Sequence, residues 1–171
     1  MEEKLTIGDV VKKWGLIYGL LGLIVAILSI IFELHTLGTT ATVLSSVLNI
    51  SIAFSIYFLA TKEFRTDNND FLEFGQGFKI VALIGLLGGV IRAIGYYVYI
   101  TIIDTGFIDW YKEQQLDAQE KAGVDIDNLP GFVSFFMSAE FLALATILGA
   151  IFGFLILGLI AVSVNKKTED Y

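Results

Sequence analysis

The chain alternates between long apolar segments and shorter polar connections. The four apolar segments cover about residues 14–34, 41–61, 78–103 and 141–164. Each is close to the roughly 20 residues that a helix needs to cross the ~30 Å hydrocarbon core of a bilayer. Because lipid offers the backbone no hydrogen-bond partner, every segment must satisfy its amides internally and is expected to be a helix. The pattern predicts an all-α polytopic membrane protein with four transmembrane helices in a bundle, forming a single membrane domain over residues 1–171.

Lys and Arg are distributed unevenly around these segments. The side predicted to hold both termini has eight, which are Lys4, Lys12, Lys13, Lys62, Arg65, Lys79, Lys166 and Lys167, against two on the opposite side, Lys112 and Lys121. Basic residues near span ends stay on the cytoplasmic side. We therefore expect a multi-pass protein of the bacterial cytoplasmic (inner) membrane with both termini in the cytoplasm. A cleaved signal peptide is the alternative for the first segment, but its apolar run is too long and no small-x-small cleavage site follows it.

The third connection, about residues 104–140, is long and acidic. It carries eight acids against two Lys, and its aromatic residues Phe107, Trp110 and Tyr111 recur at helical spacing before a polar run that ends at Gly123. This pattern predicts either an extension of the third helix or a separate amphipathic helix, with the aromatics at headgroup depth and Gly123 as its stop.

The end of this connection has two further features. Asn128 before Pro130 suits the start of another helix that leads into the fourth span. Asp125, Asp127 and Asn128 lie close together, which raises the alternative of a cation site. An EF-hand loop begun at Asp125 would, however, place Pro130 where Gly is needed and Phe136 where Glu is needed. A solvated acidic loop is therefore favoured.

Arg92 is the most informative polar residue within the apolar segments. A guanidinium near the bilayer centre costs several kcal/mol and normally faces protein or water. Small and aromatic residues share its helical face, which are Gly85, Gly88, Gly89, Gly95, Tyr96 and Tyr99. The first segment has a matching stripe, formed by Gly15, Gly19, Gly22, Ala26, Ser29 and Glu33. Small residues allow close approach of helices, so the first and third helices are expected to pack tightly together.

Three residues are candidate partners of Arg92. At ~1.5 Å per residue, Glu33 lies about 28 Å and Arg92 about 19 Å from the inner boundary, so that they could meet. Asn49 lies at a depth similar to Arg92, and Glu140 is a second carboxylate near the outer interface. One interpretation is a buried polar clasp that fixes helix order. The other is an anion or lipid-headgroup site, in which Arg92 faces a carboxylate or phosphate.

Composition and charge exclude several functions. Hydrophobic residues make up 56% of the 171 residues and charged residues 17%, which lies outside the usual range of a water-soluble domain. A net charge of −7 argues against nucleic acid as a partner, because its phosphates require a basic face.

Residues that carry chemistry are also scarce. The chain has no Cys, and its one His, His35, is predicted to lie in a short turn, where a lone His is usually structural. No Gly-rich phosphate loop follows a strand, and no nucleophile with a nearby base can be assembled. We expect no enzymatic activity, no catalytic residue, no cofactor and no metal site.

Several local motifs resemble those of a known family. Lys13, Trp14 and Gly15 lead into the first span, and Phe-Gly-Gln-Gly-Phe-Lys at residues 74–79 leads into the third. Ile102, Ile103 and Asp104 then precede the acidic loop and a last span that ends in Lys-Lys. The pattern resembles the bacterial four-span membrane proteins catalogued as domain of unknown function 4199, although members often have Pro where this chain has Thr105. The resemblance implies the four-span topology and no catalytic or binding residue.

Two functions are compatible with these features. The first is a non-catalytic subunit or scaffold of a membrane assembly, in which Gly149 and Gly153 pack against another copy of the chain or another membrane protein. Packing within one monomer is an equally good explanation of these glycines. The alternative is a small anion or lipid-headgroup transporter or binding protein that uses Arg92.

Overall fold

The computed structural model describes residues 5–34, 36–126 and 129–168. Its elements are α1 (Ile7–Ile31), α2 (Thr39–Asp67), α3 (Phe74–Val98), the π-helical η1 (Tyr99–Ile103), α4 (Gly106–Lys121), α5 (Val133–Phe136), α6 (Ala139–Gly153), the π-helical η3 (Phe154–Gly158) and α7 (Leu159–Asn165). The described residues form no strand beyond one isolated bridge between Leu72 and Lys167. The prediction of an all-α fold is confirmed.

Four helical stretches are long and apolar enough to cross a membrane. They are Ile7–Ile31, Thr39–Asp67, Phe74–Ile103 and Ala139–Asn165, the third comprising α3 with η1 and the fourth comprising α6, η3 and α7. Each overlaps one of the four apolar segments of the sequence. By length and composition, the chain is a multi-pass membrane protein.

The helix ends differ from the ends of the apolar segments for local reasons. α1 begins well before its apolar run, because the side chain of Thr6 caps the helix and Asp9 returns the bond to the Thr6 backbone. α2 continues past its apolar run to Asp67, because a helix can extend beyond the hydrocarbon core into water. α1 ends at Ile31, short of the predicted residue 34, and Glu33 adopts a left-handed conformation with φ of 49°.

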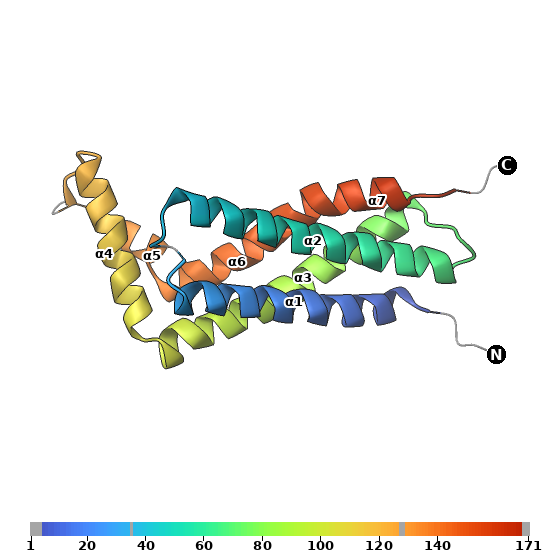
Figure 1. Ribbon diagram of the computed structural model, residues 1–171, viewed down its shortest axis with the longest axis horizontal. Helices are drawn as coiled ribbons and strands as arrows, with labels where there is room; N and C mark the ends of the chain where they lie inside the picture. The colour runs from blue at the N-terminus through green and yellow to red at the C-terminus, as the bar shows by residue number, and fades with distance from the viewer. Residues whose placement is uncertain (1–4, 35, 127–128, 169–171) are drawn as a thin grey trace.

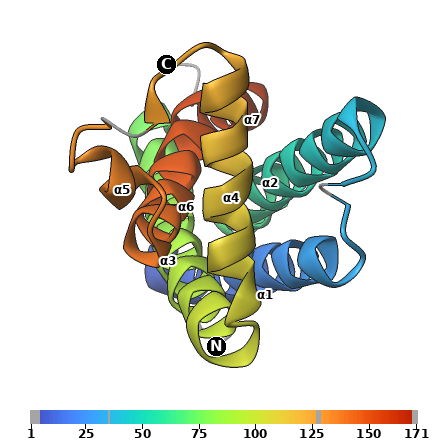
Figure 2. The same cartoon turned by 90° about the vertical axis from the view of Figure 1, so that its left-hand side faces the viewer.

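The spanning helices lie lengthwise along the molecule, and α4 lies across one end of them (Figure 1). α1 begins and α7 ends at the opposite end, which we call the terminal end; the other is the α4 end. Figure 2 views the molecule from the α4 end and shows α4 crossing in front of the helix bundle. The segment after Phe107 is thus a separate helix and not an extension of α3, and it ends just before Gly123, whose φ is 81°.

α1 and α3 pack closely through glycine, as the sequence predicts. A Cβ at Gly19 would lie 2.8 Å from the Ile91 Cβ and 3.1 Å from the backbone oxygen of Gly88. The other side of α3 approaches the fourth span in the same way, because a Cβ at Gly85 would lie 2.7 Å from the ring of Phe154. α3 therefore occupies the centre of the bundle, between α1 and the fourth span.

The main core cluster lies in the terminal half and the middle of the bundle, and only a few residues such as Ile100 are buried near the α4 end. In α2, every buried residue lies from Ala53 onward, and residues 39–52 contribute none. The buried residues of α1 likewise stop at Gly22. Tyr57, Ile84 and other fully buried side chains fill the terminal half, whereas the α4 half is more open.

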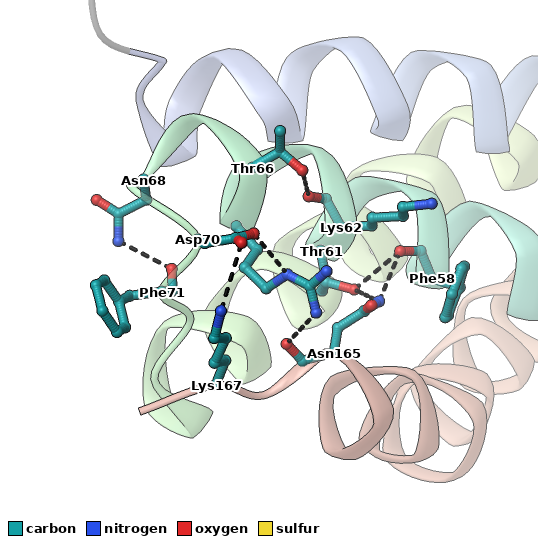
Figure 3. Close-up of polar contacts among 10 residues, drawn as sticks. Phe58, Thr61, Lys62, Thr66, Asn68, Asp70, Phe71, Asn165 and Lys167 are labelled. Atoms are coloured by element: carbon teal, nitrogen blue, oxygen red, sulfur yellow. Dashed lines mark hydrogen bonds and ion pairs between the residues drawn. The ribbon is translucent and has the colours of Figure 1, made fainter. Parts of the chain in front are cut away.

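A polar cluster joins α2 to α7 at the terminal end (Figure 3). The Nδ2 of Asn165 donates to the backbone oxygen of Phe58 and to the Thr61 Oγ1, both at 2.9 Å. The Arg65 Nη1 donates to the Asn165 backbone oxygen at 3.3 Å, and Asp70 accepts from Lys167 at 3.4 Å. These bonds hold the last turn of α7 (Leu159–Asn165) and the residues after it against α2 and the loop that follows α2.

Candidate functional site

The α4 half of the bundle contains a cavity of about 720 Å³. Its walls come from α1, α2, α3 and α6, and α4 lies over it. The volume falls within the roughly 300–1,000 Å³ typical of small-molecule sites. Arg92 is the charged residue among those that line it in the described chain; most of the others are apolar or aromatic.

Arg92 reaches the cavity along the glycine face of α1. A Cβ at Gly22 would lie 3.0 Å from the Arg92 Cδ and 3.4 Å from its Nη1, so the side chain occupies space that glycine leaves free. Tyr96, one turn further along α3, is close enough to interact with the charge of Arg92 and also lines the cavity. The guanidinium is half-buried.

No residue in the described part of the chain forms an ion pair or hydrogen bond with Arg92. Glu33, the first candidate, is exposed in the turn after α1. Because α1 ends at Ile31, Glu33 no longer continues the helical stripe that pointed it toward Arg92. Glu140 instead accepts a long bond of 3.5 Å from the Tyr97 hydroxyl.

Asn49 lines the same cavity as Arg92 but does not bond to it. Its Nδ2 donates to the backbone oxygen of Ser45 at 2.9 Å, within α2. Ser46 likewise donates to its own helix, at the Thr42 oxygen. The structure therefore brings Arg92 and Asn49 to one cavity, without the polar clasp that would join them to Glu33.

α4 covers the cavity with the face that carries Phe107, Trp110 and Tyr111, which the sequence pattern predicts at headgroup depth. Phe107, Trp110, Tyr111, Gln114 and Gln115 all line the cavity. The rings of Tyr96 and Phe107 meet edge to face with centroids 6.4 Å apart, which ties α4 to the end of α3. The spacing of these five residues on one helix face was the available signal for a covering role.

The opposite face of α4 is acidic and solvated. Lys121 donates to Asp117 at 2.6 Å within this helix, and that hydrogen bond raises the pKa of the Lys121 ammonium. The charged side chains of α4 thus lie away from the cavity. The polar groups that α4 adds to the cavity wall include the neutral amides of Gln114 and Gln115.

Two tyrosines lie where the cavity meets the terminal half, and one of them, Tyr18, lines it. The ring of Tyr18 lies 5.6 Å from that of Tyr57 between centroids. Tyr57 is fully buried, and its hydroxyl lies beside that of Tyr18 but makes no hydrogen bond of good geometry to a described residue. A Cβ at Gly153 would lie 3.8 Å from the Tyr57 hydroxyl and 3.9 Å from that of Tyr18. Both hydroxyls therefore lie close to the cavity wall at Gly153.

The glycines of the fourth span face inward. Gly149 and Gly153 both line the cavity, and a Cβ at Gly149 would meet no atom within 4 Å. Gly149 is nevertheless exposed and Gly153 half-buried, so packing of these glycines against another copy of the chain or another membrane protein stays a prediction.

The suggested cation site is only partly visible. Of its three residues, Asp125 is described, whereas Asp127 and Asn128 lie outside the described residues. His35 and Lys4, which are not part of that site, also lie outside them. Elsewhere in the described chain, no group of three or more His, Cys, Asp or Glu side chains is placed to hold a metal ion.

Comparison with known proteins identifies the family. The family model described as "Protein of unknown function (DUF4199)" matches residues 13–167. No curated protein and no solved structure matches the chain. The match covers α4 and all four spans except the first residues of α1, so the chain belongs to the DUF4199 family.

Proposed function

We propose that this protein binds a ligand with an anionic group, a carboxylate or a phosphate, through Arg92. The single observation that carries the proposal is a half-buried guanidinium in a cavity, with no counter-ion among the described residues. A charge inside a membrane protein is costly unless a partner or water compensates it. A bound anion would supply that partner, and the planar guanidinium suits the two oxygens of such a group.

The setting of Arg92 favours an organic ligand over a bare ion. Tyr96, Phe107 and Trp110 surround the same cavity with aromatic surface, and Gln114 adds hydrogen-bonding amides. Pockets for small organic molecules combine mostly apolar walls with a few polar groups that fix orientation. Arg92 would hold the anionic group while the aromatic residues contact the rest of the molecule.

The cavity opens, in this proposal, on the outer side of a bacterial cytoplasmic membrane. The terminal end carries most of the Lys and Arg, and α1 begins and α7 ends there (Figure 1). The positive-inside rule puts that end in the cytoplasm and α4 on the outer surface. The packed terminal half, with Tyr57 and Thr61 fully buried, favours a binding protein, or the outward-facing state of a transporter, over an open pore.

The test uses the full chain in lipid nanodiscs with Trp14→Phe, which leaves Trp110 in the cavity as the remaining tryptophan. Its fluorescence is followed during titration with inorganic phosphate, acetate, dodecyl phosphate and laurate. We expect a saturable change with at least one anionic probe, absent with neutral dodecanol. Arg92→Leu should abolish it and Arg92→Lys should retain part of it. No Arg92-dependent response to any of the anions would contradict the proposal.

A second candidate is a non-catalytic subunit or scaffold. It is favoured by the first half of α2, which buries no residue and exposes Val43, Leu44 and Val47. Another copy of the chain or another membrane protein would cover this surface. Purification in mild detergent tests it, and a strictly monomeric particle with no co-purifying protein would count against it.

A further inference from the structure

We infer that the ligand is a lipid-soluble amphiphile whose chain enters sideways between α1 and α2 from the membrane. The inference rests on the proposed function, because it takes Arg92 as the site of the anionic group. It adds the class of ligand and the route by which the ligand reaches the cavity.

A second cavity, of about 440 Å³, lies between the ends of α1 and α2 near α4. Ser29 and Leu34 line it from the α1 side, and Ser45 is among the α2 residues that line it. Ser29, Asn49 and Ile50 line this cavity and the Arg92 cavity alike. Because the two share these residues, the side cavity adjoins the Arg92 cavity, and the inferred route runs from the side of the bundle through both.

Four of the five polar side chains that line this side cavity, all but Ser45, donate a hydrogen bond within their own segment. Ser29 donates to the Val25 oxygen at 2.8 Å, and Asn49 donates to the Ser45 oxygen at 2.9 Å. Ser46 donates to the Thr42 oxygen at 2.9 Å. A hydrocarbon chain can therefore pass these residues without depriving their donors of partners.

The surface around the side cavity is apolar. On α2, Leu44 is 69% exposed and Val47 is 52% exposed, and on α1 Ile31 is 57% exposed. In a membrane such side chains face acyl chains. A hydrocarbon tail that leaves the side cavity would thus enter lipid. This route suits an amphiphile and does not suit a free anion dissolved in water.

The loose packing of α2 at this point is consistent with such an opening. No residue in 39–52 is buried, whereas the second half of the same helix is held by the core and by the Asn165 cluster. The free half of α2 borders the side cavity through Ser45 and Asn49.

The test blocks the side cavity and leaves Arg92 intact. Ser45→Phe places a ring at a half-buried residue that lines the side cavity. Ser51→Phe is the matched control, because Ser51 lies on the same helix, is exposed and lines neither cavity. Both variants carry Trp14→Phe, and Trp110 fluorescence reports binding of laurate, dodecyl phosphate, acetate and inorganic phosphate in nanodiscs.

The expected result has two parts. The long-chain probes should bind at least about tenfold more tightly than acetate or phosphate, since each methylene newly buried against protein adds up to about fourfold. Ser45→Phe should weaken binding of the long-chain probes by about tenfold or more, whereas Ser51→Phe should leave that binding unchanged. Helical circular dichroism and elution volume show whether both variants fold, and Ser45→Leu provides a smaller block if the Phe variant does not.

Two results would overturn the inference. Equal binding of the long-chain probes by the Ser45 and Ser51 variants would exclude the side route. Arg92-dependent binding of acetate or phosphate as tight as that of their long-chain homologues would exclude an amphiphile and still support the proposed anion site. If no probe binds in an Arg92-dependent way, both the inference and the proposed function fail.

Discussion

The side chain of Arg92 lies directly against Gly22: a Cβ at position 22 would come within 3.0 Å of the Arg92 Cδ. The first and third spans therefore do more than pack together. The glycine of one leaves the space through which the arginine of the other reaches the cavity, so the position of the charge depends on the absence of a side chain on the neighbouring helix.

Gly22→Val should displace Arg92 and weaken anion binding. The branched side chain would occupy the space of the Arg92 Cδ and Nη1, so we expect a loss of about tenfold or more in affinity, of order 1.4 kcal/mol, with Arg92 still present. Trp110 fluorescence measures it. Gly75→Val is the control, since a Cβ there meets nothing within 4 Å and Gly75 does not line the cavity; similar weakening by both variants would argue against a specific role of Gly22.

Gly19→Ala should destabilise the protein more than Gly149→Ala. A Cβ at Gly19 would press on the Ile91 Cβ at 2.8 Å and on backbone at Gly88, and overpacking of this kind costs about 1–3 kcal/mol. At Gly149 the added methyl has room, and replacing a helical Gly is neutral or favourable by up to about 1 kcal/mol. Thermal unfolding in detergent, followed by helical circular dichroism, measures the effect. The unfolding midpoint should fall for Gly19→Ala and not for Gly149→Ala.

The sequence predicted the spans and the α1 to α3 packing because each depends on local composition. Runs of apolar residues determine which segments lie in lipid, and regularly spaced glycines such as Gly15 and Gly19 mark where helices come close. The separate helix α4 was one of two alternatives, and the turn at Asp104 and Thr105 decides between them.

The cavity was not predictable in the same way. A membrane helix is apolar on its lipid side and on its packed side, so hydropathy does not tell which way Gly149 and Gly153 face. The depth argument for Glu33 also assumed that α1 continues to residue 34, whereas the helix ends at Ile31. The direction in which Gly149 and Gly153 face and the end of α1 at Ile31 together shape the surroundings of Arg92. Neither follows from the pattern of apolar residues.

Asn165→Ala should loosen the terminal end of the bundle. It removes the two side-chain bonds of 2.9 Å to Phe58 and Thr61, and loss of buried hydrogen bonds of this kind costs about 1–3 kcal/mol. Ser163→Ala, on the same helix, removes one bond of an exposed side chain to its own backbone and should change stability by less than about 0.5 kcal/mol. Equal unfolding midpoints for the two variants would show that the cluster contributes little.

Tyr57→Phe should keep or increase the stability of the ligand-free protein. The Tyr57 hydroxyl is buried beside the Tyr18 hydroxyl but makes no hydrogen bond of good geometry to a described residue, and a buried group without a full partner costs about 1–3 kcal/mol. The ring contact with Tyr18 is retained in the variant. A clear drop in the unfolding midpoint would mean that the hydroxyl makes a stabilising bond, for example to a bound water.

The stability of Arg92→Leu, with and without an anion, tests the central claim most directly. If Arg92 has no structural partner, the variant should unfold at the same temperature as the native protein or higher, because a costly unpaired charge is removed. Dodecyl phosphate at about 100 times its dissociation constant should stabilise the native protein by about 2.7 kcal/mol and leave the variant unchanged. A variant that is less stable by about 3 kcal/mol or more without ligand, or one that dodecyl phosphate stabilises as well as the native protein, would contradict a ligand site at Arg92.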